Sequence, residues 1–417
     1  FAVDCYERET AVGGTWTRQH GRGQVGASTH LVSSKPCTQF PDFPMPDEWP
    51  DFPQHTQLLS YLERYADHFG LREHIWFGTE VVRVDPVGDG ASSWDVTIRG
   101  QHGRASRIMR YAAVVIANGH TSSPNLPAYP GLADYGGTVL HASEYQDPSQ
   151  LRGRRVLVVG AGNAGCDIAV DAAGNAARCW HSSRRGYWYA PKYLLGRPTD
   201  QVMTRIQALR LPEAAHRMLR HGALRLAVGD QTRFGLPAPD HGFTETHPIV
   251  NSQLTYQIGH GGVVPVPDVA RFGRGDVTLV DGQVIEPDLV VLATGYLPTF
   301  EFIEPDLLGV DQAGRPRLRW HLFAPDRPTL AVVGLLQPDS NLFACAHWQS
   351  VLVATWLRAF DARPEAARDF WGRQAGNDAA SYHNARVKDS SRHWFEVNHL
   401  VYLRALERAL NELEAVK

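Results

Sequence analysis

The sequence predicts an α/β fold that combines two dinucleotide-binding domains, and two observations lead to this prediction. Residues 160–165 read G-x-G-x-x-G between a predicted strand, 155–159, and a predicted helix, which is the context that a dinucleotide-binding turn requires. A second predicted strand, 1–6, ends on Glu7. An acid at a strand end is where the ribose hydroxyls of a dinucleotide are held.

The glycines of the first turn have separate tasks. Gly160 makes the tight turn, Gly162 lets the backbone approach a pyrophosphate, and Gly165 lets the helix pack against the strand. Asn163 and Ala164 complete the loop. The phosphates are expected to rest on the helix N-terminus.

The next predicted strand, 177–181, is followed by a basic segment that includes Ser183, Arg184 and Arg185. An NAD site would carry an acid at about this distance, roughly 20 residues past the first glycine. A guanidinium suits the 2′-phosphate of NADP, because its planar fork donates two parallel hydrogen bonds. We therefore predict an NADP site; the alternative is a surface loop that contains two arginines by chance.

For the site ending on Glu7, the glycine loop is expected about 20 residues upstream of this acid, outside the given sequence. We therefore expect a β-α unit carrying an FAD pyrophosphate loop before residue 1. The alternative is a chain that begins here and has a turn at Gly13-Gly14.

Composition excludes several classes of protein. The 417 residues should form about two domains, and a net charge of −3 gives no reason to expect nucleic acid. The five cysteines include no C-x-x-C pair, and the 19 histidines show no zinc-binding spacing, so we expect a reducing compartment and no metal. No apolar run reaches the roughly 20 residues that span a bilayer. A soluble, cytoplasmic protein is the resulting expectation.

A segment directly before the glycine turn carries a resemblance. Tyr135, Gly137, His141 and Tyr145 have the spacing F/Y-x-G-x-x-x-H-x-x-x-Y/F, which resembles the fingerprint of the flavin-containing monooxygenases. The related Baeyer–Villiger enzymes end this motif with Trp followed by Pro or Asp, whereas this chain has Tyr145-Gln146. The resemblance therefore favours oxygenation of a heteroatom, with His141 as a brace between domains rather than a catalytic base.

Further segments agree with this family. Residues 13–16, Gly13, Gly14, Thr15 and Trp16, resemble the GG-x-W that approaches the flavin, and residues 40–46 read FPDFPMP. By this register Val32 replaces the active-site Asn of the family, and Val donates no hydrogen bond. Ser33 or Ser34 could substitute for it. No catalytic residue is otherwise identified.

The resemblance implies a Rossmann-like NADP domain inserted in a discontinuous FAD domain. The expected ranges are 1–149 for the first part of the FAD domain, 150–286 for the NADP domain with a helical insertion at about 193–240, and 287–417 for the second part of the FAD domain.

Five further cofactor-binding residues are expected from the resemblance. Asn251 ends a P-x-x-N segment, and Thr294-Gly295 lies in the Ala-Thr-Gly-Tyr sequence by which such flavoproteins return to the FAD domain. Gln337 and Gln349 are candidate flavin contacts, although each could equally be a structural polar residue.

The sequence of the insertion is typical of an amphipathic, basic segment. Its apolar residues alternate with arginines; they are Val202, Ile206, Leu209, Met218 and Leu219. Such a segment can lie on a membrane or a partner. A solvated face over the entrance to the active site is the interpretation we favour.

The implied function is an NADPH- and O₂-dependent FAD monooxygenase that oxygenates an amine nitrogen or a thioether sulfur through a C4a-hydroperoxyflavin. Its partners would be O₂ and a small-molecule substrate, and a homo-oligomer is compatible with the sequence. Three alternatives stay open: a Baeyer–Villiger ketone monooxygenase, an NADPH oxidase, which Val32 suggests, and a non-catalytic NADP-binding module.

Overall fold

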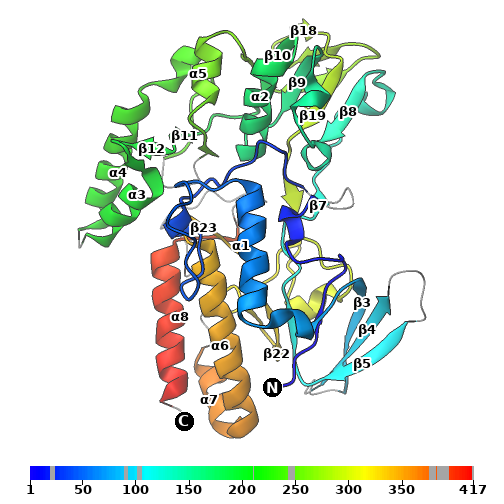
Figure 1. Ribbon diagram of the computed structural model, residues 1–417, viewed down its shortest axis with the longest axis vertical. Helices are drawn as coiled ribbons and strands as arrows, with labels where there is room; N and C mark the ends of the chain where they lie inside the picture. Colours follow the sequence, from blue (N-terminus) through cyan, green and yellow to red (C-terminus); the bar gives the residue numbers. More distant parts are fainter. Residues whose placement is uncertain are drawn as a thin grey trace.

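The computed structural model describes residues 1–18, 24–88, 93–100, 106–209, 211–242, 249–374, 382 and 394–415. They form an upper lobe, a lower lobe and a pair of helices that projects to one side between them (Figure 1). Both chain ends lie at the far end of the lower lobe.

A five-stranded parallel sheet forms the centre of the upper lobe. In spatial order its strands are β15 (Val264–Val266), β10 (Arg178–Ser182), β9 (Arg155–Val159), β19 (Leu289–Leu292) and β8 (Thr138–His141). All four residues of β19 and four of the five in β9 are buried. Strands of a parallel sheet are covered on both faces, and this explains their uninterrupted apolar sequences.

Both faces of the sheet are covered. Helix α2 (Asn163–Asn175) packs on one face through Ile168 and Ala172. An antiparallel meander covers the other face; its strands are β16 (Val269–Phe272), β17 (Val277–Leu279) and β18 (Val284–Ile285). The sequence therefore folds here as the dinucleotide-binding α/β unit that its glycine pattern predicts.

Two strands of this sheet lie outside the range 150–286 that was predicted for the NADP domain. β8 precedes the range, and β19 follows it, pairing with β9 on one side and with β8 on the other. The predicted boundaries at 149/150 and 286/287 therefore do not coincide with the limits of the sheet. An apolar run indicates a buried strand, but it does not indicate which sheet the strand joins.

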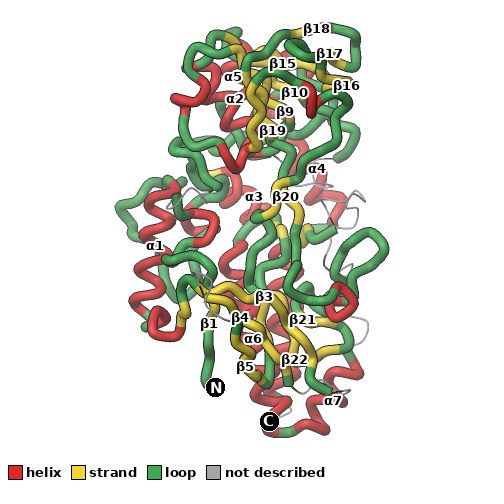
Figure 2. Tube along the Cα trace, turned by 90° about the vertical axis from the view of Figure 1, so that its right-hand side faces the viewer, coloured by secondary structure: helices red, strands yellow, loops and turns green. Residues whose placement is uncertain are grey.

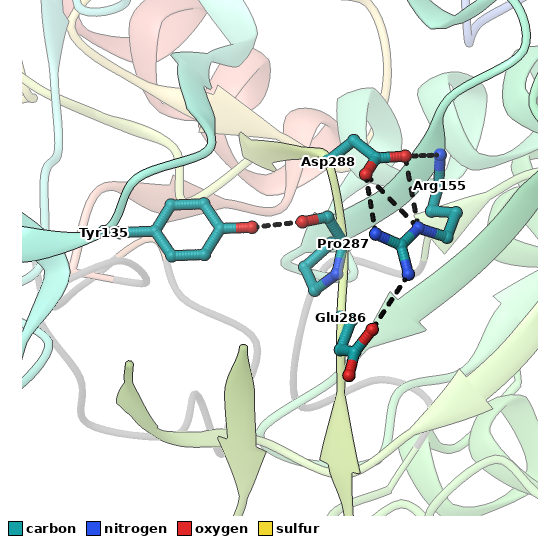
Figure 3. Close-up of polar contacts among 5 residues, drawn as sticks. All are labelled: Tyr135, Arg155, Glu286, Pro287 and Asp288. Carbon is teal, nitrogen blue, oxygen red and sulfur yellow. Dashed lines mark hydrogen bonds and ion pairs between the residues drawn. The ribbon is translucent and has the colours of Figure 1, made fainter. Parts of the chain in front are cut away.

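Polar contacts tie β19 to its neighbours at the point where the strand begins (Figure 3). The guanidinium of Arg155 contacts Asp288 at 2.8 Å and Glu286 at 3.1 Å, and Tyr135 donates its hydroxyl hydrogen to the carbonyl of Pro287. The hydrogen bonds from Arg155 lower the pKa of Asp288. The predicted boundary at 286/287 passes through this cluster.

Two extended segments join the lobes and pair with each other. β7 (Ser123–Pro124) runs antiparallel to β20 (Tyr296–Leu297), and β20 lies between the lobes in Figure 2. The two segments in which the chain passes between the lobes, β7 and β20, therefore form one paired connection.

Helices and short sheets build the lower lobe. The helices are α1 (His55–His68), α6 (Leu342–Ala362), α7 (Pro364–Arg373) and α8 (His399–Glu414). The sheets are β21–β22–β6 (Phe323–Ala324, Arg327–Val332, Val114–Ile116), β3–β4–β5 (Thr79–Pro86, Trp94–Gly100, Arg107–Tyr111) and β23–β24 (Gln337–Pro338, Glu396–Val397). Trp356, Phe370 and Tyr402 belong to the core between the helices.

The strand predicted over residues 1–6 is shorter in the structure. Only β1 (Cys5–Tyr6) forms, and it pairs with β2 (Ile75–Trp76) alone. Phe1 and Val3 are 71% and 60% exposed, so no described strand or helix covers their side chains. The apolar character of residues 1–3 therefore does not place them in a sheet here.

The described residues of the predicted insertion, together with those on either side of it, form small sheets and helices. The sheets are β11–β14 (Tyr189–Ala190, Ile249–Val250) and β12–β13 (Tyr193–Leu194, Arg197–Pro198). The helices are α3 (Thr199–Ala208), α4 (Glu213–Val228) and, after the second strand of the first sheet, α5 (Leu254–Gly259). Leu209 lies just past the end of α3, and Met218 and Leu219 are exposed; Arg210 lies outside the described residues. Among the described residues, none of the helices has the length and apolarity that crossing a bilayer requires.

Candidate dinucleotide-binding site

The turn between β9 and α2 has no room for side chains at two of its glycines. Gly160 has a φ of 115°, and a Cβ added there would lie 2.3 Å from the carbonyl oxygen of Ala293. A Cβ at Gly165 would lie 1.9 Å from the carbonyl oxygen of Gly160. The turn is therefore compressed between α2 and the end of β19, as the predicted tasks of Gly160 and Gly165 require.

The remaining residues of the turn begin the helix. Gly162 is the N-cap of α2. Asn163 accepts the backbone N–H of Val250 through its Oδ1 at 3.0 Å, which fixes β14 beside the start of α2. Ala164 is exposed. The helix N-terminus is thus open to an anionic group at the carboxyl end of the sheet.

His181 forms a hydrogen bond with the backbone of this turn. The sequence analysis did not identify it as a residue of the site. It is 0% exposed on β10, and its Nε2 lies 3.1 Å from the carbonyl oxygen of Gly160. Burial lowers its pKa to about 4, so the ring is neutral near pH 7 and Nε2–H is the donor. A histidine inside an apolar strand that leads toward the predicted cofactor site was the available signal.

The basic segment after β10 presents one arginine to solvent. Ser183 is buried, and its backbone N–H binds the carbonyl of Val266. Arg184 is exposed and makes no hydrogen bond or ion pair with any residue that the structure describes. Arg185 instead binds the hydroxyl of Tyr187 through Nε at 3.1 Å and lies over its ring. Of the two arginines, Arg184 is the one available to a phosphate.

Asn251 faces inward. Its Oδ1 accepts the backbone N–H groups of Gln253 and Leu254, and its Nδ2 donates to Oδ1 of Asp167 at 2.8 Å. The amide therefore caps α5 and holds a carboxylate of α2, which differs from the direct cofactor contact expected from the sequence. Pro248 of the predicted P-x-x-N segment lies outside the described residues.

Thr294 and Gly295 lie where β19 leaves the sheet. The hydroxyl of Thr294 donates to the carbonyl of Asn125 at 2.6 Å, and the carbonyl of Gly295 accepts the N–H of Asn125 at 2.9 Å. Nε2 of His141 approaches the same carbonyl of Gly295. His141 therefore has the position of the predicted brace, between the end of β8 and the paired connection.

The last residue of the predicted fingerprint shares a carboxylate on α2 with Ser28, which comes from the first part of the chain. Tyr145 donates its hydroxyl hydrogen to Oδ2 of Asp171 on α2 at 2.8 Å, and Ser28 donates to the same oxygen at 2.5 Å. The interface between the lobes is thus built on the exposed side of α2.

The residues expected near a flavin lie on the lower lobe. Glu7 follows β1, and its Oε1 accepts the N–H of Glu9 at 2.7 Å. Gly13, with a φ of 133°, precedes a single helical turn formed by Gly14, Thr15 and Trp16. Gly14 is exposed, and a Cβ there would meet nothing within 4 Å, so the backbone of this turn is accessible from outside.

Val32 and the two serines beside it lie in the loop that faces the insertion. Val32 is half-buried. Ser33 accepts from the hydroxyl of Thr38 at 3.2 Å, and Ser34 accepts from Nε2 of Gln201 at 3.2 Å. Both serines therefore accept internal hydrogen bonds, and each keeps the hydroxyl hydrogen that a replacement for the amide would have to donate.

The two glutamines differ. Gln337 lies in β23, and its side chain is half-buried. Gln349 is 0% exposed; its Oε1 accepts the N–H of Gly334, and its Nε2 donates to the carbonyl of His321 and to Tyr402. Gln349 therefore shapes the turn at Gly334 from inside the core, and its buried amide cannot touch a flavin directly.

Comparisons with known proteins agree with this geometry. The family described as "Flavin-binding monooxygenase-like" matches residues 2–411. Flavin-containing monooxygenase 5 of Rattus norvegicus is 31% identical over 358 residues, and dimethylaniline monooxygenase [N-oxide-forming] 2 of Oryctolagus cuniculus is 31% identical over 362; each match covers 83% of this chain and 67% of the relative. The structure of S-allyl-L-cysteine S-oxygenase from Allium sativum superimposes with a TM-score of 0.64 at 20% identity, over 98% of this chain and 82% of that one. This last likeness is one of fold.

Proposed function

The chain belongs to the flavin-binding monooxygenase-like family, and we propose that it is an NADPH- and O₂-dependent FAD monooxygenase that oxygenates an amine nitrogen or a thioether sulfur. The observation that carries the proposal is the compressed Gly160–Gly165 turn, followed by an exposed Arg184 that has no partner in the described chain, in a member of a flavin-binding family.

Residues on both lobes fit the two cofactors. The N-terminus of α2 and Arg184 would hold the diphosphate and the 2′-phosphate of NADP. Glu7 and the turn at Gly13-Gly14 would lie against FAD, with open space at Gly14. Bound flavin takes hydride from NADPH and activates dioxygen. The protein's part is to orient the two cofactors and to exclude water.

Tyr145 favours a heteroatom substrate over a ketone, because the fingerprint ends in Tyr145-Gln146 rather than in Trp. Its hydroxyl is bound to Asp171 at the interface between the lobes. The proposed substrate is therefore a small soft nucleophile. We also propose a cytoplasmic location, which the absence of paired cysteines supports.

The experiment is a purification followed by a substrate panel. We expect a yellow protein with flavin absorbance whose NADPH consumption requires O₂, and which yields N-oxides or sulfoxides from amines and thioethers. Esters or lactones from ketones would reassign it to Baeyer–Villiger chemistry. A colourless protein that does not consume NADPH in air would overturn the proposal.

A further inference from the structure

Lys192 and Asp167 are two charged residues that lie near each other without closing an ion pair. The backbone N–H of Lys192 donates to Oγ of Ser252 at 2.8 Å, and the preceding residue, Asn251, donates to Asp167 at 2.8 Å. Lys192 follows β11, and Asp167 lies on α2. Burial raises the pKa of Asp167 to about 6 and lowers the pKa of Lys192. The charge of each group partly offsets this effect of burial on the other group. Both side chains are described, and no ion pair joins them.

Each group keeps an unused hydrogen-bonding position. Nζ of Lys192 donates to the carbonyl of Leu31 at 3.0 Å and lies 4.9 Å from the centre of the Phe52 ring, and an ammonium has three N–H donors. Asp167 accepts from Asn251 through Oδ1, and nothing in the described chain donates to its Oδ2. One free donor and one free acceptor therefore lie near each other, both partly buried.

Their place in the fold is beside the dinucleotide turn. Asp167 is one helical turn past Asn163, and Asn163 accepts the N–H of Val250 on β14, the strand paired with β11. Dinucleotides bind at this carboxyl edge of the sheet. The contact of Lys192 with Leu31 shows that the pair faces the lower lobe.

We propose that Lys192 and Asp167 form a subsite for a planar carboxamide, the nicotinamide end of NADP. Lys192 donates to the carboxamide oxygen, and Asp167 accepts from the carboxamide N–H. A primary amide is the neutral group that offers an acceptor and a donor side by side, so it satisfies both side chains at once. The inference rests on the proposed use of NADPH.

Binding measurements on the flavin-loaded full chain test the lysine. We expect Lys192→Met, which keeps the apolar stem, to weaken NADP⁺ binding about tenfold or more, since hydrogen bonds to charged groups are strong. It should leave 2′,5′-ADP, which lacks nicotinamide, unchanged in titration calorimetry. Equal weakening of both ligands would overturn the subsite, because it would indicate a general loss of structure.

The aspartate is tested by a change of ligand specificity. The wild type should prefer NADP⁺ to nicotinic acid adenine dinucleotide phosphate, whose carboxylate is repelled by Asp167. Asp167→Asn can donate to that carboxylate and still accept from Asn251, so the ratio of the two affinities should shift about tenfold or more toward the acid.

Asp171→Asn is the matched control, one turn further along the same helix and also at the interface. It removes the same charge and should leave the affinity ratio unchanged. An unchanged ratio in Asp167→Asn, or an equal shift in Asp171→Asn, would overturn the subsite. Failure of the wild type to bind 2′,5′-ADP would instead contradict the proposed use of NADPH.

Discussion

Nε2 of His141 lies 3.1 Å from the carbonyl oxygen of Gly295, so the end of β8 is bound to the segment that leaves β19 for the lower lobe. Nδ1 of the same ring accepts the backbone N–H of Ser143 at 3.1 Å. The proton is therefore on Nε2, and the ring is a donor to Gly295. His141 is 3% exposed, which leaves it no free nitrogen for acid–base work.

His141→Leu is expected to destabilise the protein while leaving bound flavin in place. The change removes the donor to Gly295 and the acceptor for Ser143 at nearly constant volume, which should cost about 1–2 kcal/mol of unfolding free energy. Denaturant unfolding measures it. His74→Ala, at an exposed histidine, is the control and should change stability by less than about 0.5 kcal/mol. Equal effects of the two substitutions would contradict the brace.

We expect the protein to lose unfolding free energy in weak acid, because the pKa of His181 is lowered in the folded state. Its folded pKa, about 4, lies below the unfolded value of about 6.5, so the unfolded state binds more protons in this interval. The contribution is fully present above pH 6.5 and is lost as the pH falls toward 4, by up to about 3 kcal/mol. Urea unfolding between pH 7.5 and 4.5 measures it.

His181→Gln separates this residue from other histidines. The pKa values of His55, His120 and His141 are also lowered, mainly by burial, so part of the acid sensitivity should remain. The variant should be less stable than the wild type at pH 7.5 and should show a shallower decline below pH 6.5. A decline as steep as that of the wild type would show that His181 does not titrate in this range.

Two glycines of α2 are expected to respond in opposite directions to alanine. A Cβ at Gly165 overlaps the carbonyl of Gly160, so Gly165→Ala should cost about 1–3 kcal/mol and weaken NADP⁺ binding. A Cβ at Gly174 meets nothing within 4 Å, so Gly174→Ala should stabilise the helix by up to about 1 kcal/mol. Thermal unfolding and NADP⁺ titration measure both. A tolerated Gly165→Ala would contradict the compressed turn.

The sequence was informative where one residue type is forced by local geometry. The glycine turn, β9 and α2 could be predicted because only glycine fits at positions 160 and 165 without a clash with the backbone, and because the strand–turn–helix order is local. The paired arginines lead to the prediction of a phosphate site, which stays a prediction. Only the structure distinguishes Arg184 from Arg185, since stacking on Tyr187 is a side-chain contact.

Long-range pairing could not be read from the sequence. The apolar run at β19 is equally compatible with either lobe, and only its register with β8 and β9 assigns it to the upper sheet. In the same way Gln349 and Asn251 are polar residues near expected cofactor segments. The amide of Gln349 is satisfied by the backbone of Gly334 and His321, and Nδ2 of Asn251 by the carboxylate of Asp167. A linear pattern does not reveal these long-range contacts.

Val32→Asn is expected to reduce the hydrogen peroxide released per NADPH consumed, if an amide at this position supports oxygen transfer as the family resemblance implies. The neighbouring serines accept hydrogen bonds from Thr38 and Gln201, and the substitution adds the amide donor that Val32 lacks. Peroxide release and NADPH consumption are measured together without and with substrate. Val32→Leu is the control, because it adds volume and no donor. A ratio that falls equally in both variants would indicate packing rather than hydrogen bonding.

Arg184 gives the most direct test of coenzyme choice. Because its guanidinium is exposed and has no hydrogen-bond or ion-pair partner in the described chain, it can donate two parallel hydrogen bonds to a 2′-phosphate. Arg184→Ala should raise the KM for NADPH about tenfold or more and change the KM for NADH little. Arg185→Ala is the matched neighbour: it loses the contacts with Tyr187, and we expect a smaller change that is similar for both coenzymes. Initial rates of flavin reduction at varied coenzyme concentration measure these values. An equal loss for NADPH and NADH in Arg184→Ala would remove the assignment, since a residue that holds the 2′-phosphate cannot affect a coenzyme that lacks one.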